Sequence, residues 1–114
     1  MHELSIAQEI LSIVKASLPT PDAKVIAIRL KIGHLSGILI DSLKFSFEAI
    51  TSQTEFENTQ LEIIEVPIKI TCNDCSKTSI LYEPIFLCPD CNSFNVQLLE
   101  GRELEILEIE IEDN

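Results

Sequence analysis

Two pairs of cysteines, each pair separated by two residues, constrain this chain more than any other feature. The pairs are Cys72 with Cys75 and Cys88 with Cys91, and the chain contains four cysteines in all. Each C-x-x-C pair forms a tight turn that directs two sulfurs at one point, so four thiolates can surround one tetrahedral ion. Because protein ligands then fill every position around the ion, the pattern predicts a structural zinc site without chemistry at the metal.

Three other interpretations of the four cysteines compete with zinc. Two disulfides could form, but nothing in the sequence suggests export. A redox-active pair is the second alternative, although Cys72 does not open a helix in a βαβ setting and the other pair would then have no role. Iron is the third, because a four-thiolate set suits iron as well as zinc. Absorbance distinguishes iron, since iron–thiolate centres are coloured and zinc centres are not.

The charge of the chain argues against nucleic acid as a partner. Nineteen Asp and Glu outnumber eight Lys and Arg, which gives a formal net charge of −11, and no basic cluster is available to neutralise phosphates. No segment approaches the roughly 18 consecutive apolar residues of a membrane span. The start, Met1-His2-Glu3, lacks the basic region of a signal peptide, so we expect a cytoplasmic protein without a membrane partner. That compartment favours a bound metal over disulfides.

Hydrophobic periodicity predicts two helices and three strands outside the cysteine window. In chain order we expect a helix over 4–18, a strand over 25–32, a helix over 42–51 capped by Asp41, a strand over 61–66 and a strand over 103–110. Within the window, residues 79–87 predict a strand pair around a turn at Pro84.

The predicted fold class follows from this order of elements. It is α+β, with two helices packed on a three-stranded sheet and a four-cysteine zinc-ribbon insert before the last strand. The expected domains are an α/β domain of residues 1–66 with 101–114 and a zinc-binding domain of residues 67–100. Because the short insert has little core of its own, metal binding should supply much of its folding energy.

Five short motifs, in order and at suitable spacing, resemble the HypA/HybF family of nickel metallochaperones. The motifs are Met1-His2-Glu3-Leu4-Ser5, Gly33-x-Leu35-Ser36-Gly37, Asp41-Ser42-Leu43-Lys44-Phe45-x-Phe47-Glu48, the paired cysteines with Cys88-Pro89-x-Cys91, and Gly101-Arg102-Glu103-Leu104. The resemblance runs nearly end to end. This chain departs from the family pattern at Ser76 and Asn92, where glycine is expected after each second cysteine.

The resemblance implies a nickel site at the start of the chain, through His2. The Met1 amine, the His2 backbone nitrogen and the His2 imidazole can form fused chelate rings around one ion. The backbone nitrogen of Glu3, or a group from a partner, could supply a fourth planar donor. Nitrogen donors in a plane suit Ni(II) or Cu(II), unlike the soft four-sulfur site. His34, the other histidine, is expected to be an exposed loop residue.

The function implied by the resemblance is that of a metallochaperone. The protein would carry Ni(II) for maturation of [NiFe]-hydrogenase, and of urease in some bacteria, while Zn(II) keeps its structural site. The implied partners are a HypB-type GTPase, the hydrogenase large-subunit precursor and urease accessory proteins. We expect no enzyme activity, because no nucleophile is paired with a histidine base and no glycine-rich loop could cradle a phosphate. The alternative is a zinc-ribbon interaction or regulatory module without a nickel role.

Overall fold

The computed structural model describes residues 2–112. Its elements are α1 (Glu3–Ser17), β1 (Val25–Gly33), α2 (Ile40–Thr51), β2 (Gln60–Val66), β3 (Ile68–Cys72), β4 (Thr78–Leu81), β5 (Val96–Glu100) and β6 (Leu104–Ile111). The strands form two three-stranded sheets, with orders β2-β1-β6 and β4-β3-β5. The predicted α+β class, with a cysteine-bearing insert before the last strand, is confirmed.

The chain divides into two compact units. Among the described residues, the first unit comprises 2–30, 38–64 and 105–112, and the second comprises 31–37 and 65–104. The first unit therefore contains both helices, and the second contains the four cysteines.

Helix α1 buries one stripe of aliphatic side chains at helical spacing. The buried residues are Ile6, Ala7, Ile10, Leu11 and Val14. The helix ends at Ser17, and Leu18 is extended with φ −71° and ψ 141°, because a residue before proline is disfavoured in the helical conformation. Within residues 2–112, no helix combines the length and the apolar character needed to cross a membrane.

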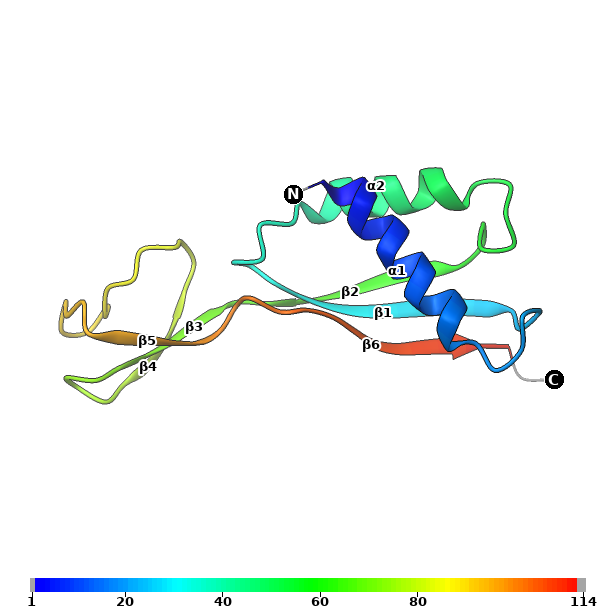
Figure 1. Ribbon diagram of the computed structural model, residues 1–114. Coiled ribbons are helices and arrows are strands. Elements are labelled where there is room, and N and C mark those ends of the chain that lie inside the picture. The colour runs from blue at the N-terminus through cyan, green and yellow to red at the C-terminus, as the bar shows by residue number, and fades with distance from the viewer. Residues whose placement is uncertain (1, 113–114) are drawn as a thin grey trace. The chain divides into compact units, whose positions relative to one another are not determined.

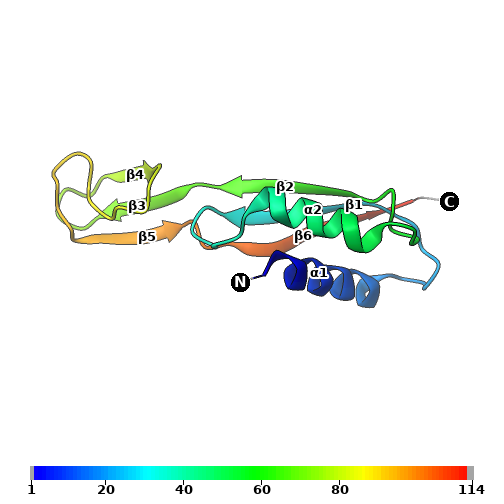
Figure 2. The same cartoon turned by 90° about the horizontal axis from the view of Figure 1, so that it is seen from above.

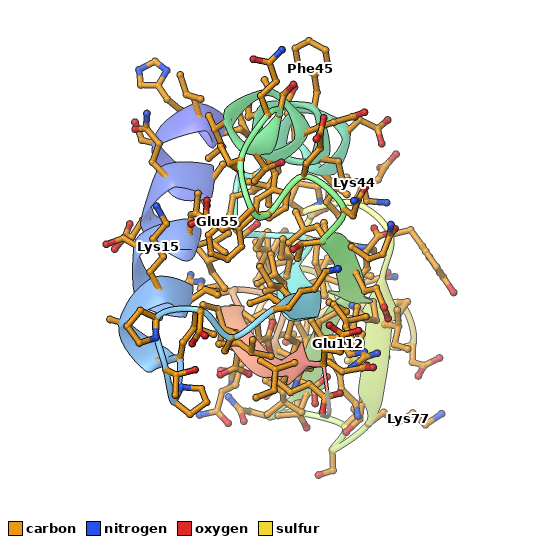
Figure 3. The ribbon with its side chains drawn as sticks, turned by 90° about the vertical axis from the view of Figure 1, so that its right-hand side faces the viewer. Lys15, Lys44, Phe45, Glu55, Lys77 and Glu112 are labelled. Carbon is orange, nitrogen blue, oxygen red and sulfur yellow. The ribbon has the colours of Figure 1, made fainter. Side chains whose placement is uncertain are left out.

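Helix α2 begins two residues earlier than expected, at Ile40, and the predicted cap at Asp41 is wrong. The N-cap is Leu39, and Asp41 lies in the first turn, where the helix dipole favours an acidic side chain. Leu43 and Phe47 point into the core, with 0% and 3% exposure. The two helices pack against each other and lie on the same face of the β2-β1-β6 sheet (Figures 1 and 2). Phe45 on α2 points away from the sheet (Figure 3).

Arg29 links the central strand of this sheet to both of its edge strands. Its guanidinium lies 3.1 Å from Glu62 Oε1 on β2, and 3.2 Å and 2.8 Å from Glu108 Oε1 and Glu110 Oε1 on β6. Hydrogen bonds to Glu110 and then Glu62 raise the pKa of Arg29 above its usual value. One cation thus offsets several carboxylates in a chain with a large acidic excess.

The second unit is built around β3, which pairs antiparallel with both β4 and β5. Its core contains Ile68, Ile70 and Leu81, with Leu35, Val96 and Leu98 packed against them. The predicted strand pair over 79–87 is wrong: only Thr78–Leu81 is a strand, and its partner is β3. Pro84 lacks the N–H that a second ladder would need, and the chain from Tyr82 leads to the second cysteine pair without forming a strand.

Candidate metal sites

The four cysteine sulfurs of the second unit meet at one point. All four Sγ atoms lie within 4.8 Å of one another. Two contacts join one pair to the other: Cys72 Sγ to Cys91 Sγ, and Cys75 Sγ to Cys88 Sγ, are each 3.6 Å. A disulfide requires about 2.05 Å, so the cysteines are free thiols.

The two cysteine pairs lie on two separate backbone turns of the same kind, which explains how the sulfurs converge. In the first turn, Ser76 N donates to Cys72 O and Cys72 N donates to Lys77 O, at 2.9 Å and 2.8 Å. The equivalent bonds of the second turn, Asn92 N to Cys88 O and Cys88 N to Ser93 O, are both 2.9 Å. The two turns therefore have matching geometry, and each directs its sulfurs toward the other.

The spacing of the sulfurs fits a tetrahedral zinc ion. Zinc–sulfur bonds of about 2.3 Å place neighbouring sulfurs about 3.8 Å apart in a regular tetrahedron, close to the two 3.6 Å contacts. Cys72 and Cys88 are 2% and 1% exposed, whereas Cys91 is exposed. The arrangement fills all four positions with sulfur, which is the chemistry of a structural site.

Hydrogen bonds, burial and neighbouring thiols shift the pKa values of two of these cysteines in opposite directions. The backbone N–H of Cys91 and then that of Asp90 lower the pKa of Cys88 to about 7, against the effect of burial. The N–H of Ser93 favours the Cys91 thiolate, but the thiol of Cys72 and burial outweigh it and raise the pKa of Cys91 to about 12. Four thiolates together therefore need a cation, and binding that cation releases protons.

Side chains also join the two cysteine turns. Asp74, between Cys72 and Cys75, accepts hydrogen bonds from Ser93 Oγ and, at 3.2 Å, from Asn95 Nδ2. These bonds lower the pKa of Asp74. The sequence alone contained no signal for this contact, because it depends on how the second turn lies against the first.

The start of the chain forms a second candidate site, in the first unit. His2 is the N-cap of α1, and its side chain is exposed. Its backbone oxygen accepts the first helical bond, from Ile6 N at 3.2 Å. Met1, the third residue of the predicted nickel site, lies outside the described residues.

Glu3 contacts the start of α2. Its Oε2 accepts a hydrogen bond from Leu39 N at 3.2 Å, and this bond, followed by one from the Glu3 backbone, lowers the pKa of the Glu3 carboxyl. The apolar side chain of Leu39 cannot cap α2. Glu3 therefore supplies, from another helix, the contact that a capping-box glutamate makes within its own helix.

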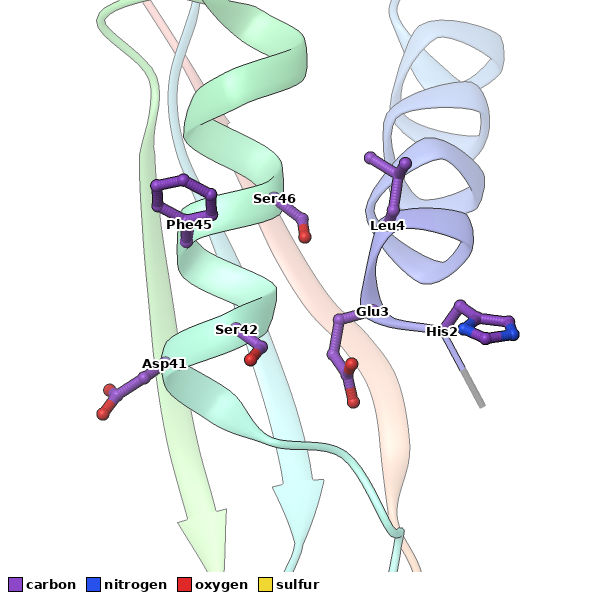
Figure 4. A pocket seen from close by; sticks show the side chains of 7 residues that line it. All are labelled: His2, Glu3, Leu4, Asp41, Ser42, Phe45 and Ser46. Atoms are coloured by element: carbon purple, nitrogen blue, oxygen red, sulfur yellow. The ribbon is translucent and has the colours of Figure 1, made fainter.

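A shallow hollow of about 470 Å³ lies between the two helix starts. Its lining residues come from the first turn of α1 and the first two turns of α2: His2, Glu3, Leu4, Asp41, Ser42, Phe45 and Ser46. In Figure 4, the Glu3 side chain lies between the helix ends, and the His2 ring points away from α2. The imidazole is thus open to an approaching ion.

The remaining histidine, His34, lies beside a carboxylate of the same unit. His34 Nε2 lies 3.2 Å from Glu65 Oε1 in the second unit, and the two side chains are 43% and 58% exposed. His34 is a half-exposed turn residue, and the described metal-ligand cluster contains only the four cysteines.

Comparison with known proteins finds one family that matches nearly the whole chain. A family model described as hydrogenase/urease nickel incorporation, metallochaperone, HypA matches residues 1–111. A hydrogenase maturation factor HypA from Desulfatibacillum aliphaticivorans is 39% identical over 115 residues, covering 99% of this chain and 88% of the relative. A protein of the same name from Trichormus variabilis is 40% identical over 113 residues, covering 99% and 97%.

Solved structures show the same fold. The solution structure of the Ni metallochaperone HypA from Helicobacter pylori aligns with a TM-score of 0.63 and 23% identity over 97% of both chains. A second solution structure, of a HypA protein, gives a TM-score of 0.65 and 23% identity over 97% of this chain.

These observations define a class of protein: an α+β fold with a four-thiol cluster and an exposed histidine at the start of its first helix. The chain belongs to the HypA family of hydrogenase maturation factors, as its family match and relatives show.

Proposed function

We propose that this protein is a nickel metallochaperone that binds Ni(II) at its N-terminus and delivers it during maturation of [NiFe]-hydrogenase. Urease is a second recipient in hosts that make one. The observation that carries the proposal is the family match over residues 1–111, which includes the N-terminal motif. The exposed His2 at the N-cap of α1 supports the same assignment.

In this proposal the Met1 amine, the His2 backbone nitrogen and the His2 imidazole chelate nickel. The Glu3 N–H occupies the first position of α1, where a helix offers no carbonyl partner. Its nitrogen could therefore complete the plane without breaking a helical bond. The Glu3 carboxylate already accepts the Leu39 N–H, so its role is to hold the motif against α2.

Zinc occupies the four-cysteine site and is retained while nickel is passed on. Cys72, Cys75, Cys88 and Cys91 supply the ligands, and their spacing supports that ion. We assign nickel binding to a domain of residues 1–66 with 101–114 and zinc binding to a domain of residues 67–100. The metal's contribution here is structural: it stabilises the turns, and the chain's own residues do no chemistry on it.

In this proposal the protein is not an enzyme and acts in the cytoplasm. Its partners are a HypB-type GTPase and the hydrogenase large-subunit precursor, with urease accessory proteins where urease is made. The net charge of −11 supports protein rather than nucleic acid partners.

Complementation tests this function. A bacterium that makes [NiFe]-hydrogenase and lacks its own HypA would receive either this protein or its His2→Ala variant, under limiting nickel. We expect hydrogenase activity with the unaltered protein only, and partial recovery of the variant strain with excess nickel. Equal activity with both proteins at limiting nickel would contradict the proposal.

A further inference from the structure

A single carboxylate, that of Asp74, makes side-chain hydrogen bonds between the two cysteine turns. Asp74 lies in the first turn, and both of its oxygens accept hydrogen bonds from residues that follow the second turn: Oδ2 from Ser93 Oγ, and Oδ1 from Asn95 Nδ2 at 3.2 Å. Ser93 Oγ in turn accepts a bond from Asn95 N at 3.0 Å. The carboxylate therefore fixes both the side chains and the backbone of this segment.

Asn73, the residue before Asp74, also makes hydrogen bonds to the segment that follows the second turn. Asn73 N donates to Asn95 O at 2.9 Å, and Asn73 Nδ2 donates to Asn95 Oδ1 at 3.1 Å. The two residues between Cys72 and Cys75 are thus bonded to the segment that follows Cys91. None of these bonds uses a sulfur atom, so they can hold the turns together without competing with a metal.

The second turn offers a natural comparison, because its geometry matches that of the first. Asp90 stands two residues after Cys88, as Asp74 stands two residues after Cys72. Its contact across the turns is with Lys77 Nζ at 3.7 Å, between side chains that are 49% and 65% exposed. Such an exposed ion pair contributes little, so the two equivalent aspartates differ mainly in their hydrogen bonds.

We propose that Asp74 is a positioning residue of the four-cysteine metal site, which holds the second turn against the first and slows loss of the metal. The inference rests on the proposed zinc site and deepens it. Groups behind the ligands commonly set the geometry and affinity of a metal centre. In this site the group is the Asp74 carboxylate, and it acts on the backbone of the turns rather than on a ligand side chain.

A purely electrostatic role for Asp74 makes a different prediction. Four thiolates and one zinc ion form a dianion, so removing either nearby carboxylate should relieve repulsion and retain the metal at least as well. Asp74→Ala and Asp90→Ala remove the same charge from equivalent positions. Only the positioning role predicts that they behave differently, with faster zinc release from Asp74→Ala and little change in Asp90→Ala.

Zinc release from the full-length protein tests the proposal. Zinc-loaded wild type, Asp74→Ala, Asp74→Asn, Ser93→Ala and Asp90→Ala would be mixed with excess 4-(2-pyridylazo)resorcinol. We expect release about three- to tenfold faster for Asp74→Ala, a smaller effect for Asp74→Asn, and less than a twofold change for Asp90→Ala. The double variant Asp74→Ala/Ser93→Ala should release zinc more slowly than the product of the two single effects predicts, since the two changes share the contact between Asp74 and Ser93.

Cobalt substitution separates positioning from loss of the site. With Co(II) in place of zinc, Asp74→Ala should keep the intense sulfur-to-cobalt band of four thiolates but shift the weaker d–d bands, which report the arrangement of the sulfurs. Wild-type d–d bands in Asp74→Ala, or release rates equal to those of Asp90→Ala, would overturn the role of Asp74. If wild type itself binds no stoichiometric zinc, the proposed zinc site fails, which is a separate result.

Discussion

Ser76 and Asn92 share a left-handed backbone conformation, with φ angles of 64° and 61°. Each follows the second cysteine of its pair, and each N–H donates to the carbonyl of the first cysteine. Glycine reaches this conformation without cost, and asparagine tolerates it better than most residues. The two departures from the family pattern are therefore not equivalent, because only Ser76 is poorly suited to its position.

Ser76→Gly should stabilise the second unit by up to about 1 kcal/mol, because it removes the steric cost of a side chain at positive φ. Asn92→Gly should have a smaller effect. The measurement is the guanidinium midpoint at which zinc is released from the loaded protein. Ser79→Gly is the matched control: Ser79 lies in the extended strand β4, where glycine should lower the midpoint. A midpoint for Ser76→Gly at or below that of wild type would count against this account.

Gly33 should tolerate no larger residue. A Cβ at this position would lie 2.1 Å from Gly101 O, and the same strand end is fixed by a bond from Gly33 N to Glu103 O at 2.8 Å. We expect Gly33→Ala to destabilise the second unit by about 3 kcal/mol. Gly37→Ala is the comparison: its φ is +79° but no described atom lies within 4 Å of its Cβ, so the cost should be about 1 kcal/mol. Chemical unfolding of both variants checks this order, and a larger loss for Gly37→Ala would refute it.

Arg29→Met should destabilise the first unit, because it leaves Glu62, Glu108 and Glu110 without their shared cation. We expect a Tm several degrees below that of wild type at low ionic strength, and a smaller difference in 1 M salt, which screens carboxylate repulsion. Arg29→Lys should recover only part of the loss, since one ammonium cannot copy the planar guanidinium fork. Scanning calorimetry at two salt concentrations makes the comparison. Equal Tm values for all three proteins at low salt would show that the cluster contributes nothing.

Cys88→Ser should abolish stoichiometric zinc binding and leave the first unit folded. Cys88 is 1% exposed within the sulfur cluster, whereas the helices have their own aliphatic core around Val14, Ile28 and Leu43. Metal analysis of the purified variant and circular dichroism near 222 nm test the two parts. Retention of one zinc per chain, or loss of the helical signal, would contradict this division.

The sequence predicts local structure well and misses contacts between distant segments. Periodicity and Pro19 locate α1 to within a residue at each end, and the cysteine spacing predicts the sulfur cluster. By contrast, the sequence predicts neither β3 nor β5, because these short segments become strands where they pair with each other. The segment 31–37 joins the second unit through bonds such as Leu35 N to Gly101 O at 2.6 Å.

The functional contacts follow the same division. His2 is recognisable from its motif, but the bond from Leu39 N to Glu3 depends on how the two helices pack. Likewise, Asp74 finds Ser93 and Asn95 only after the second cysteine turn has folded against the first. Local pattern predicts candidate ligands, and tertiary structure decides which residues contact them.

Calorimetric nickel titration of the zinc-loaded protein tests the central claim most directly. Wild type, His2→Ala and His34→Ala would be compared in the form that begins with Met1, with zinc content and circular dichroism recorded for each. A form extended by one residue before Met1 tests the chelate, because it moves the amine away from the imidazole. We predict one tight nickel site in wild type and His34→Ala, its loss in His2→Ala with zinc and fold unchanged, and altered binding in the extended form. Nickel binding by His2→Ala as tight as that of wild type would contradict the account.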